Sequence, residues 1–344
     1  MDGSSLKPAL PLTMGSHLLP PVSSPLTTRR VVITGGAGFI GQAVAQALVA
    51  RDVEVTLLDL PERIGRVAPT LRSRVVAGDV GENSAYERLD AAGTYDAVIH
   101  LAAQTSNRVS HERPELDVNT NARGTLLVTE WCCARGIRRL LYSSSMAVYG
   151  HPEKLPIQEN DRTLPFSYYG ITKLAGEHYI RANAGRGLNA TIFRLFNVYG
   201  PGQDLANLKQ GMASIYLAYV LQRQKLPVTG SLDRYRDFVY IDDVVAAFLL
   251  ALDEPGTHGR IFNLGTGTST TVQDLLRLII TSAGEDPVKY PVEQVASHAG
   301  DQFGMVADAS LFRTGFGWRP TVSLPEGIQR MVTWARSELA GTAG

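Results

Sequence analysis

The chain has 344 residues, 44% of them hydrophobic, which is enough for one large domain or two modest ones around a substantial core. Lysine plus arginine (33) equals aspartate plus glutamate (33), so no overall basic field would attract nucleic acid or an anionic membrane. No apolar run approaches the roughly 18 residues that a membrane-spanning helix needs. An anionic ligand would therefore have to be held by local donors.

Residues 1–29 are rich in proline, serine and threonine, and they lack the basic and continuous apolar regions of a signal peptide. We expect them to form a flexible extension of a cytoplasmic protein. The two cysteines, Cys132 and Cys133, are neighbours within a helical pattern, where geometry disfavours a disulfide between them. Two buried, reduced thiols are therefore expected, and no metal site is predicted.

Short runs rich in β-branched residues alternate with segments of helical periodicity from residue 30 to about residue 200. The expected helices include 43–50 and 124–135, and such alternation is typical of βαβ units. The sequence therefore predicts an α/β fold with a Rossmann-type doubly wound parallel sheet. The expected strands are residues 30–34, 53–59, 74–78, 97–102, 138–143 and 190–196.

After about residue 200 the pattern changes to short strands and helices separated by proline- and glycine-rich loops. We predict that residues 30–200 form a nucleotide-binding Rossmann domain and that residues 201–336 form mainly a smaller C-terminal α/β substrate lobe. Segments around 236–267 are expected to return to the first domain. Because such folds bind ligands at the carboxyl ends of their strands, the smaller lobe should close over that edge.

Three glycines, Gly35, Gly38 and Gly41, form a G-x-x-G-x-x-G array between the first strand and a helix expected over residues 42–49. The first glycine permits a tight turn, and the second lets the backbone approach a pyrophosphate. The third lets the helix pack closely on the strand. In this context the array predicts a dinucleotide-binding loop.

Asp59 ends the second expected strand, 18 residues after the last glycine of the array. A carboxylate there would bond the 2′-hydroxyl of the adenosine ribose and repel a 2′-phosphate, which favours NAD over NADP. Arg63 and Arg66 follow closely and leave NADP as an alternative. We predict NAD as the cofactor and residues 30–200 as the NAD-binding domain.

Two further segments follow strands on the predicted cofactor side. Asp79 comes after the third strand, where it would either bond the adenine amino group or cap a turn. The small residues after the fourth strand would let the backbone lie against the cofactor. The predicted cofactor-binding residues are Gly35, Gly38, Phe39, Ile40, Gly41, Asp59, Asp79, Val80, Leu101, Ala102, Ala103, Tyr169 and Lys173.

Tyr169 and Lys173 stand four residues apart, so a helix would place both side chains on one face. A phenol with its ordinary pKa near 10 is a poor base at neutral pH. A neighbouring ammonium and a positive nicotinamide ring would lower that pKa, and the lysine would also hold the nicotinamide ribose. Tyr168 stands five residues from Lys173 and falls off this face.

These motifs together resemble the extended short-chain dehydrogenase/reductase family over residues 30 to about 336. Within it the chain is most similar to the nucleotide-sugar 4-epimerases of the UDP-galactose 4-epimerase type. The motifs that carry the resemblance are TGGAGFIG (34–41), HLAAQ (100–104), NARGT (121–125), SSSMAVYG (143–150), YYGITK (168–173), RLFNVYGPG (194–202), RDFVYIDDVV (236–245), FNLGTG (262–267) and GWRP (317–320).

The resemblance implies a catalytic set of Ser145, Tyr169 and Lys173. Ser145 would bond the sugar 4-oxygen, Tyr169 would take the proton of the 4-hydroxyl and Lys173 would tune Tyr169. C4 would pass a hydride to NAD. The resulting 4-keto sugar would then rotate within the site and take the hydride back on its opposite face. The substrate would be a nucleotide-diphosphate sugar linked to UDP or dTDP.

The resemblance also implies substrate contacts, and each of these residues has a purely structural role as the alternative. Arg236 matches a position that contacts the diphosphate, although a surface salt bridge with Asp237 or Asp233 would also explain it. Asn197 matches a substrate-contacting asparagine, against a role in a turn. Asn121 would either organise the active site or support a loop.

Three residues of the expected substrate lobe depart from the family pattern or lie near such a departure. His298 stands where the family usually has arginine, which puts a second diphosphate contact in doubt. Asp301 would still accept bonds from a ribose. Met305 falls where the epimerases have a residue that controls room around the sugar C2 substituent, and a long methionine favours a confined pocket.

Met146 and Ala147 follow Ser145 directly and carry no acid or base. Resembling 4,6-dehydratases have Asp-Glu at these two positions, and decarboxylases keep a glutamate at the second. The sequence therefore favours 4-epimerisation, with 4-ketoreduction by NAD(P)H as the main alternative; a dehydratase and a non-catalytic dinucleotide sensor are less favoured. By resemblance we also expect a homodimer, formed through a four-helix bundle of helices around 110–135 and 169–183.

Overall fold

The structure is a computed structural model that describes residues 27–69, 71, 75–296 and 302–342. Most of the predicted N-terminal extension, together with His298 and Asp301, lies outside the described residues. None of the described helices is both long enough and apolar enough to cross a membrane. No group of three or more potential metal ligands occurs among the described residues.

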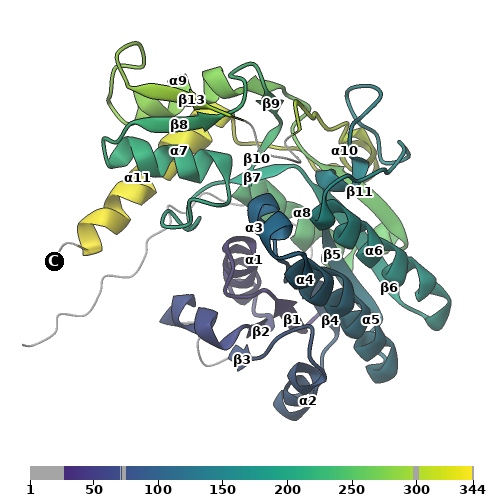
Figure 1. The fold of residues 1–344 in the computed structure, drawn as a ribbon. Coiled ribbons are helices and arrows are strands. Elements are labelled where there is room, and N and C mark those ends of the chain that lie inside the picture. The colour runs from purple at the N-terminus through teal and green to yellow at the C-terminus, as the bar shows by residue number, and fades with distance from the viewer. Residues whose placement is uncertain (1–26, 70, 72–74, 297–301, 343–344) are drawn as a thin grey trace, which may run out of the picture.

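A seven-stranded parallel sheet forms the centre of the molecule, with strand order β11-β6-β5-β4-β1-β2-β3 (Figure 1). It confirms the predicted fold class. Helices cover both faces, which explains why Val31, Val32 and Ile33 are all fully buried. Where strands were predicted, their ends differ by two residues at most. The strands are β1 (Arg30–Thr34), β2 (Glu54–Asp59), β3 (Val75–Ala77), β4 (Ala97–His100), β5 (Arg139–Ser145), β6 (Asn189–Leu195) and β11 (Arg260–Leu264).

The helices form one layer on each face of this sheet. One layer contains α1 (Phe39–Val49), α8 (Ile241–Asp253) and α10 (Ser310–Phe316). The other contains α2 (Asn83–Ala92), α5 (Gly124–Arg135) and α6 (Tyr168–Ala182), and Figure 1 shows α5 and α6 side by side. Both cysteines are free thiols on α5; Cys132 is buried as predicted, but Cys133 is only half-buried.

The helical segment before α5 is interrupted. It begins as α3 (Asn107–Glu112) and α4 (Pro114–Asp117), continues as the π-helix η3 (Val118–Arg123) and runs directly into α5. A π-helical turn is rare and often marks a functional site. The short 3₁₀ segments named in the described part of the chain are η1 (Pro61–Arg66), η4 (Met146–Tyr149), η5 (Ala184–Arg186) and η6 (Pro255–Thr257).

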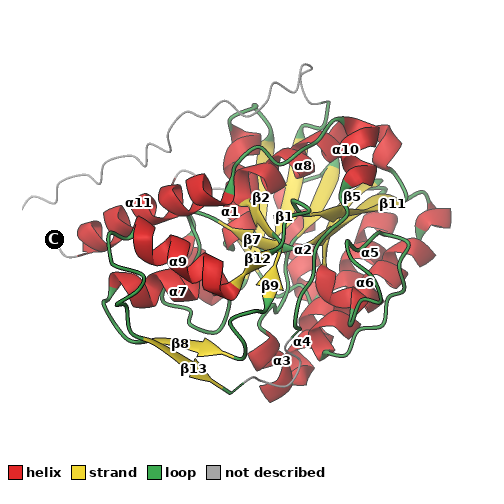
Figure 2. Cartoon of the chain, turned by 90° about the horizontal axis from the view of Figure 1, so that it is seen from above, coloured by secondary structure: helices red, strands yellow, loops and turns green. Residues whose placement is uncertain are grey.

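The later part of the chain adds small strand pairs and further helices beside the main sheet (Figure 2). The parallel pair of β8 and β13 lies with α7, α9 and α11 in a smaller unit. Two more pairs, β7 with β10 and β9 with β12, lie between this unit and the main sheet. The bounds are β7 (Asn197–Tyr199), α7 (Met212–Leu221), β8 (Leu226–Thr229), β9 (Tyr235–Arg236), β10 (Phe238–Tyr240), β12 (Thr270–Thr271), α9 (Val272–Ser282), β13 (Val292–Val295) and α11 (Leu324–Thr342).

Candidate active site

The end of β5 and the first turns of α6 bring the three predicted catalytic residues together. Ser145 ends β5, and its hydroxyl oxygen accepts the backbone N–H of Ala147 at 3.2 Å, which starts η4. A hydrogen bond joins Ser145 to the half-buried Tyr169. Lys173 lies one turn further along α6 and is 1% exposed. Ser145, Tyr169 and Lys173 therefore occupy one corner of the fold, at the carboxyl edge of the sheet.

Local sequence explains why α6 begins where it does. The hydroxyl oxygen of Ser167 caps the helix by accepting the backbone N–H of Gly170 at 3.1 Å. Gly170 has no side chain to hold α6 away from η4, since a Cβ atom there would lie 2.6 Å from the Ala147 carbonyl oxygen. One turn and a half later, a Cβ atom on Gly176 would lie 2.4 Å from the Tyr142 hydroxyl. Gly170 therefore lets α6 approach η4 closely, and Gly176 lets it approach β5.

Burial dominates the electrostatics of this corner. It raises the pKa of Tyr169 to about 12, against the hydrogen bond from Ser145 and together with the charge of Asp117. The lowered pKa expected beside the Lys173 ammonium and an oxidised nicotinamide ring stays a prediction for the cofactor-bound enzyme. Burial also lowers the pKa of Lys173 to about 7, although the carboxylates of Glu177 and Asp117 oppose this. The Lys173 ammonium lies 4.4 Å from the ring centroid of Tyr142.

Behind the catalytic corner lies a buried ion pair that sequence reasoning missed. The guanidinium of Arg194 on β6 donates to both carboxylate oxygens of Glu177 on α6, at 3.0 and 2.7 Å. The Ser144 hydroxyl donates to the same carboxylate at 2.5 Å. The side chains of the ion pair are only 5% and 2% exposed. The sequence contains a signal for the position of Glu177. It stands four residues after Lys173, which a helix places on the same face, and Ser144 directly precedes Ser145.

The glycine array lies between β1 and α1, as predicted. Gly35 has φ of +70°, and a Cβ atom there would be 2.7 Å from the backbone nitrogen of Ala102. The helix begins at Phe39 rather than at residue 42, so Gly41 lies inside it against the Gly35 carbonyl. No side chain caps the start of α1 at Gly38. A glycine cradle ahead of a helix with uncapped N–H groups fits a pyrophosphate.

Asp59 ends β2 beside this loop and is 6% exposed. One carboxylate oxygen accepts the backbone N–H of Ala37 in the glycine array, and the other accepts that of Leu60, both at 2.8 Å. Burial raises the pKa of this carboxyl group, and Arg63 opposes the shift. Arg66 pairs with Asp204 at 2.6 Å. Asp59 therefore occupies the place predicted for a ribose contact, and it also fixes the loop.

The other predicted cofactor residues surround the same edge. Asp79 accepts the backbone N–H of Gly81 at 2.8 Å, so it caps a turn, while its contact with adenine stays a prediction. Val80 is 4% exposed. The residues Leu101, Ala102 and Ala103 follow β4 and are half-buried next to Gly35.

Asn121 links three parts of the site from the π-helix η3. Its side-chain oxygen accepts the backbone N–H of Gln104 at 2.9 Å, and its amide nitrogen donates to the Gln104 carbonyl at 3.0 Å. The amide also donates to the Thr172 hydroxyl at 3.2 Å, next to Lys173. Asn121 is fully buried. It therefore joins the loop after β4 to α6, which combines the two roles that the sequence left open.

The predicted substrate residues Asn197 and Arg236 lie on the small strands β7 and β9, in a second corner of the fold. The Asn197 amide donates to the Asp237 carbonyl at 3.1 Å and lies 3.8 Å from the Met146 sulfur. Arg236 is 7% exposed and donates to the backbone carbonyls of Tyr235 and Phe303. A surface salt bridge with Asp237 is therefore the wrong alternative.

The Asp237 carboxylate serves a different purpose. It accepts the backbone N–H groups of Thr266, Gly267 and Ala307 at 2.8 to 3.0 Å. Ala307 follows shortly after the predicted substrate residue Met305, which is fully buried in a small apolar cluster near Met146. Asp237 thus ties the Met305 segment to the loop after β11.

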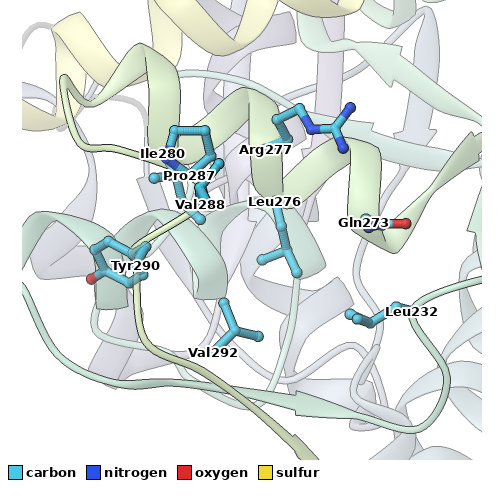
Figure 3. A pocket seen from close by; sticks show the side chains of 9 residues that line it. All are labelled: Leu232, Gln273, Leu276, Arg277, Ile280, Pro287, Val288, Tyr290 and Val292. Carbon is cyan, nitrogen blue, oxygen red and sulfur yellow. The ribbon is translucent and has the colours of Figure 1, made fainter.

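A cavity of about 380 Å³ lies elsewhere, between α9 and the segment that leads into β13 (Figure 3). None of the predicted site residues lines it. Its walls are mostly apolar and consist of Leu232, Gln273, Leu276, Arg277, Ile280, Pro287, Val288, Tyr290 and Val292.

Comparison with known proteins places this site in a family. Residues 31–265 match the NAD dependent epimerase/dehydratase family. A protein named putative UDP-glucose 4-epimerase from Methanocaldococcus jannaschii is 33% identical over 312 residues, which cover 89% of this chain and 98% of that protein.

Two solved structures are similar throughout. The crystal structure of UDP-glucose 4-epimerase with UDP-glucose from Thermotoga maritima has a TM-score of 0.83 and 33% identity, covering 90% of this chain and 99% of that one. The Thermus thermophilus UDP-glucose 4-epimerase in complex with NAD has a TM-score of 0.81 and 33% identity, covering 89% and 99%. The chain therefore belongs to the NAD dependent epimerase/dehydratase family of extended short-chain dehydrogenases/reductases, as an enzyme with NAD as its cofactor.

Proposed function

We propose that the protein is a nucleotide-sugar 4-epimerase that interconverts UDP-hexoses at C4. The observation that carries this proposal is the hydrogen-bonded pair of Ser145 and Tyr169 with Lys173 one turn away. Met146 and Ala147 beside it offer no acid or base for dehydration or decarboxylation. Relatives named UDP-glucose 4-epimerase supply the substrate class.

The residues at the carboxyl edge of the sheet fit NAD. The backbone of Gly35–Gly41 would hold the pyrophosphate, Asp59 the adenosine ribose and Lys173 the nicotinamide ribose. When bound, NAD would supply the hydride acceptor and donor for C4.

Tyr169 is proposed to take the proton of the sugar 4-hydroxyl and to return it. Burial holds its phenol in the protonated form, so deprotonation requires positive charge nearby. The Lys173 ammonium and an oxidised nicotinamide ring would supply that charge. Ser145 would donate to the 4-oxygen as negative charge develops on it. Both side chains are preorganised, because η4 and the first turn of α6 are in direct contact.

The rest of the substrate would lie along the second corner. Arg236 is proposed to hold the diphosphate, and Asn197 is proposed to contact the substrate. Met146 and Met305 would bound the sugar pocket, which favours a hexose with a small substituent at C2. Asp301 is proposed to contact the ribose of the nucleotide.

A homodimer in the cytoplasm is proposed as the working form. Three large apolar side chains are exposed where η3 and α6 face outward: Val118 at 57%, Tyr168 at 48% and Ile171 at 48%. Pairing of these helices with those of a second copy would bury the three side chains in a four-helix bundle. Sedimentation of the purified chain tests this, and a monomer at micromolar concentration would contradict it.

The function is tested by incubating the purified protein with UDP-glucose and no added cofactor. Proton NMR should detect UDP-galactose in a redox-neutral conversion, because NAD is regenerated in each cycle. Parallel incubations with UDP-N-acetylglucosamine, UDP-glucuronate and dTDP-glucose define the sugar and the nucleotide. If turnover occurs only when NAD(P)H and a 4-keto sugar are supplied, the protein is a ketoreductase and the proposal is wrong.

A further inference from the structure

Asp117, the last residue of α4, is a fully buried carboxylate beside the candidate active site. One of its oxygens accepts the Ser110 hydroxyl. The other accepts the side-chain amide of Gln104 at 2.7 Å and that of Asn121 at 3.2 Å. These donors come from three different elements, so the carboxylate is the centre of a hydrogen-bond network rather than a local cap. No motif in the sequence singled it out.

The network reaches the backbone of Tyr169. The Ser110 oxygen accepts the backbone N–H of Tyr169 at 3.0 Å, in the first turn of α6. Because this N–H has no partner within the helix, an external acceptor is needed there. The Ser110 hydroxyl points its own hydrogen at Asp117. A chain of two hydrogen bonds therefore runs from the Asp117 carboxylate to the residue that carries the phenol.

Asp117 also lies close to Lys173, because the Asn121 amide donates to its carboxylate at 3.2 Å and to the hydroxyl of Thr172, the residue before Lys173, at 3.2 Å. No ion pair within 4.0 Å joins Asp117 or Lys173 to an opposite charge among the described residues, so the two interact through space. The charge of Asp117 raises the pKa of Lys173, against the lowering by burial, and it raises the pKa of Tyr169. The groups that face Lys173 are Glu177 on α6, Tyr142 on β5, His100 on β4 and Asp117 on α4. The groups that face Asp117 are His111 on α3 and Tyr169 and Lys173 on α6.

We propose that Asp117 is a positioning residue of the active site, which holds the start of α6 through Ser110 and supplies the negative charge that offsets the buried ammonium of Lys173. The proposal rests on the proposed function for the roles of Tyr169 and Lys173. It extends that function by assigning a buried carboxylate that touches neither of the two side chains directly. Its two effects are separable, because Ser110 carries only the first of them.

The charge effect is tested by carbon-13 NMR of the lysine Cε atoms. The chain has six lysines, and Lys173→Met assigns the signal of interest. In Asp117→Asn the titration midpoint of Lys173 should move to lower pH. Glu115→Gln, an exposed change on the same helix, should leave it unchanged. If Asp117→Asn folds and the midpoint stays in place, the charge effect is overturned.

A second variant covers the case in which Asp117→Asn does not fold. Coupling is reciprocal, so in Lys173→Met the Asp117 carboxyl carbon should titrate at higher pH than in the wild type. An unchanged midpoint overturns the charge effect as well. Neither measurement needs turnover, so an inactive wild type would overturn the proposed function and leave these readings intact.

The positioning effect is tested by pH profiles of kcat with the substrate found for the wild type. Ser110→Ala should lower kcat about three- to tenfold, the equivalent of one hydrogen bond, with both limbs unmoved. In Asp117→Asn both limbs should move to lower pH, because the pKa values of Tyr169 and Lys173 both fall. An unchanged kcat in Ser110→Ala overturns the positioning effect.

Discussion

The Ala147 carbonyl and Gly170 approach each other so closely that a Cβ atom on Gly170 would lie 2.6 Å from the carbonyl oxygen. Ala147 belongs to the 3₁₀ turn that follows Ser145, and Gly170 follows Tyr169 on α6. This one backbone contact therefore sets the distance between the two hydroxyls of the candidate active site. Gly170 is therefore required by its packing against Ala147 and not by its own backbone conformation.

Gly170→Ala should lower kcat roughly tenfold to a hundredfold, because a displaced α6 would carry Tyr169 away from Ser145. Gly315→Ala in α10 is the matched control, since no atom lies within 4 Å of a Cβ atom there. The control should keep full activity and gain up to about 1 kcal/mol in stability from helix propensity. Steady-state kinetics and thermal unfolding of both variants provide the test. If Gly170→Ala keeps the wild-type kcat, the contact between Gly170 and Ala147 does not set the position of Tyr169.

Tyr169→Phe should lower kcat by about 10²–10⁴-fold, since it removes the only group proposed to move the 4-hydroxyl proton. The content of bound NAD, measured after acid release, should not change. Tyr168→Phe alters the exposed neighbour, which packs its ring edge against His111, and should leave kcat unchanged. Turnover that survives the change at Tyr169 would contradict the mechanism.

Glu177→Gln should lower the free energy of unfolding by about 3–5 kcal/mol, because it leaves the buried Arg194 guanidinium without its counter-charge. Glu130→Gln breaks an exposed pair with Arg186, of the same 2.7 Å length, and should cost no more than about 1 kcal/mol. Urea unfolding of the two variants measures the difference. Equal losses would mean that burial does not distinguish the two ion pairs.

Lys173→Met should change how stability depends on pH. In the folded chain the pKa of Lys173 is about 7, and in the unfolded chain it is near the ordinary value of about 10.4. Between these values the unfolded chain binds a proton that the folded chain has lost, so the lysine makes stability rise with pH. Below about pH 7 both states are protonated, and this contribution is constant.

The free energy of unfolding of the wild type, minus that of Lys173→Met, should therefore increase from pH 7 to pH 9.5. The raised pKa of Tyr169 gives the opposite slope only above about pH 10, outside this window. Urea titrations at four pH values measure the difference. A flat difference would contradict the buried environment of Lys173.

Much of the cofactor side follows from local sequence. Gly35, Gly38 and Asp59 are specified by backbone conformation and by their distance along a βαβ unit, and both constraints are local. Tyr169 and Lys173 are also a local pattern, since a helix places residues four apart on one face. The start of α1 was placed three residues too late, because no side chain caps it at Gly38.

What the sequence determined by itself is the parallel α/β fold, the glycine loop and the candidate catalytic pair of Tyr169 and Lys173, because strand period, helix period and glycine spacing are properties of short segments. Only the tertiary structure decided the ionisation of those side chains. The pKa of Tyr169 is raised in the chain because burial is a sum over neighbours from several elements. The partners Asp117 and Arg194 likewise reach the site from other parts of the chain, a relationship that spacing along the sequence does not encode.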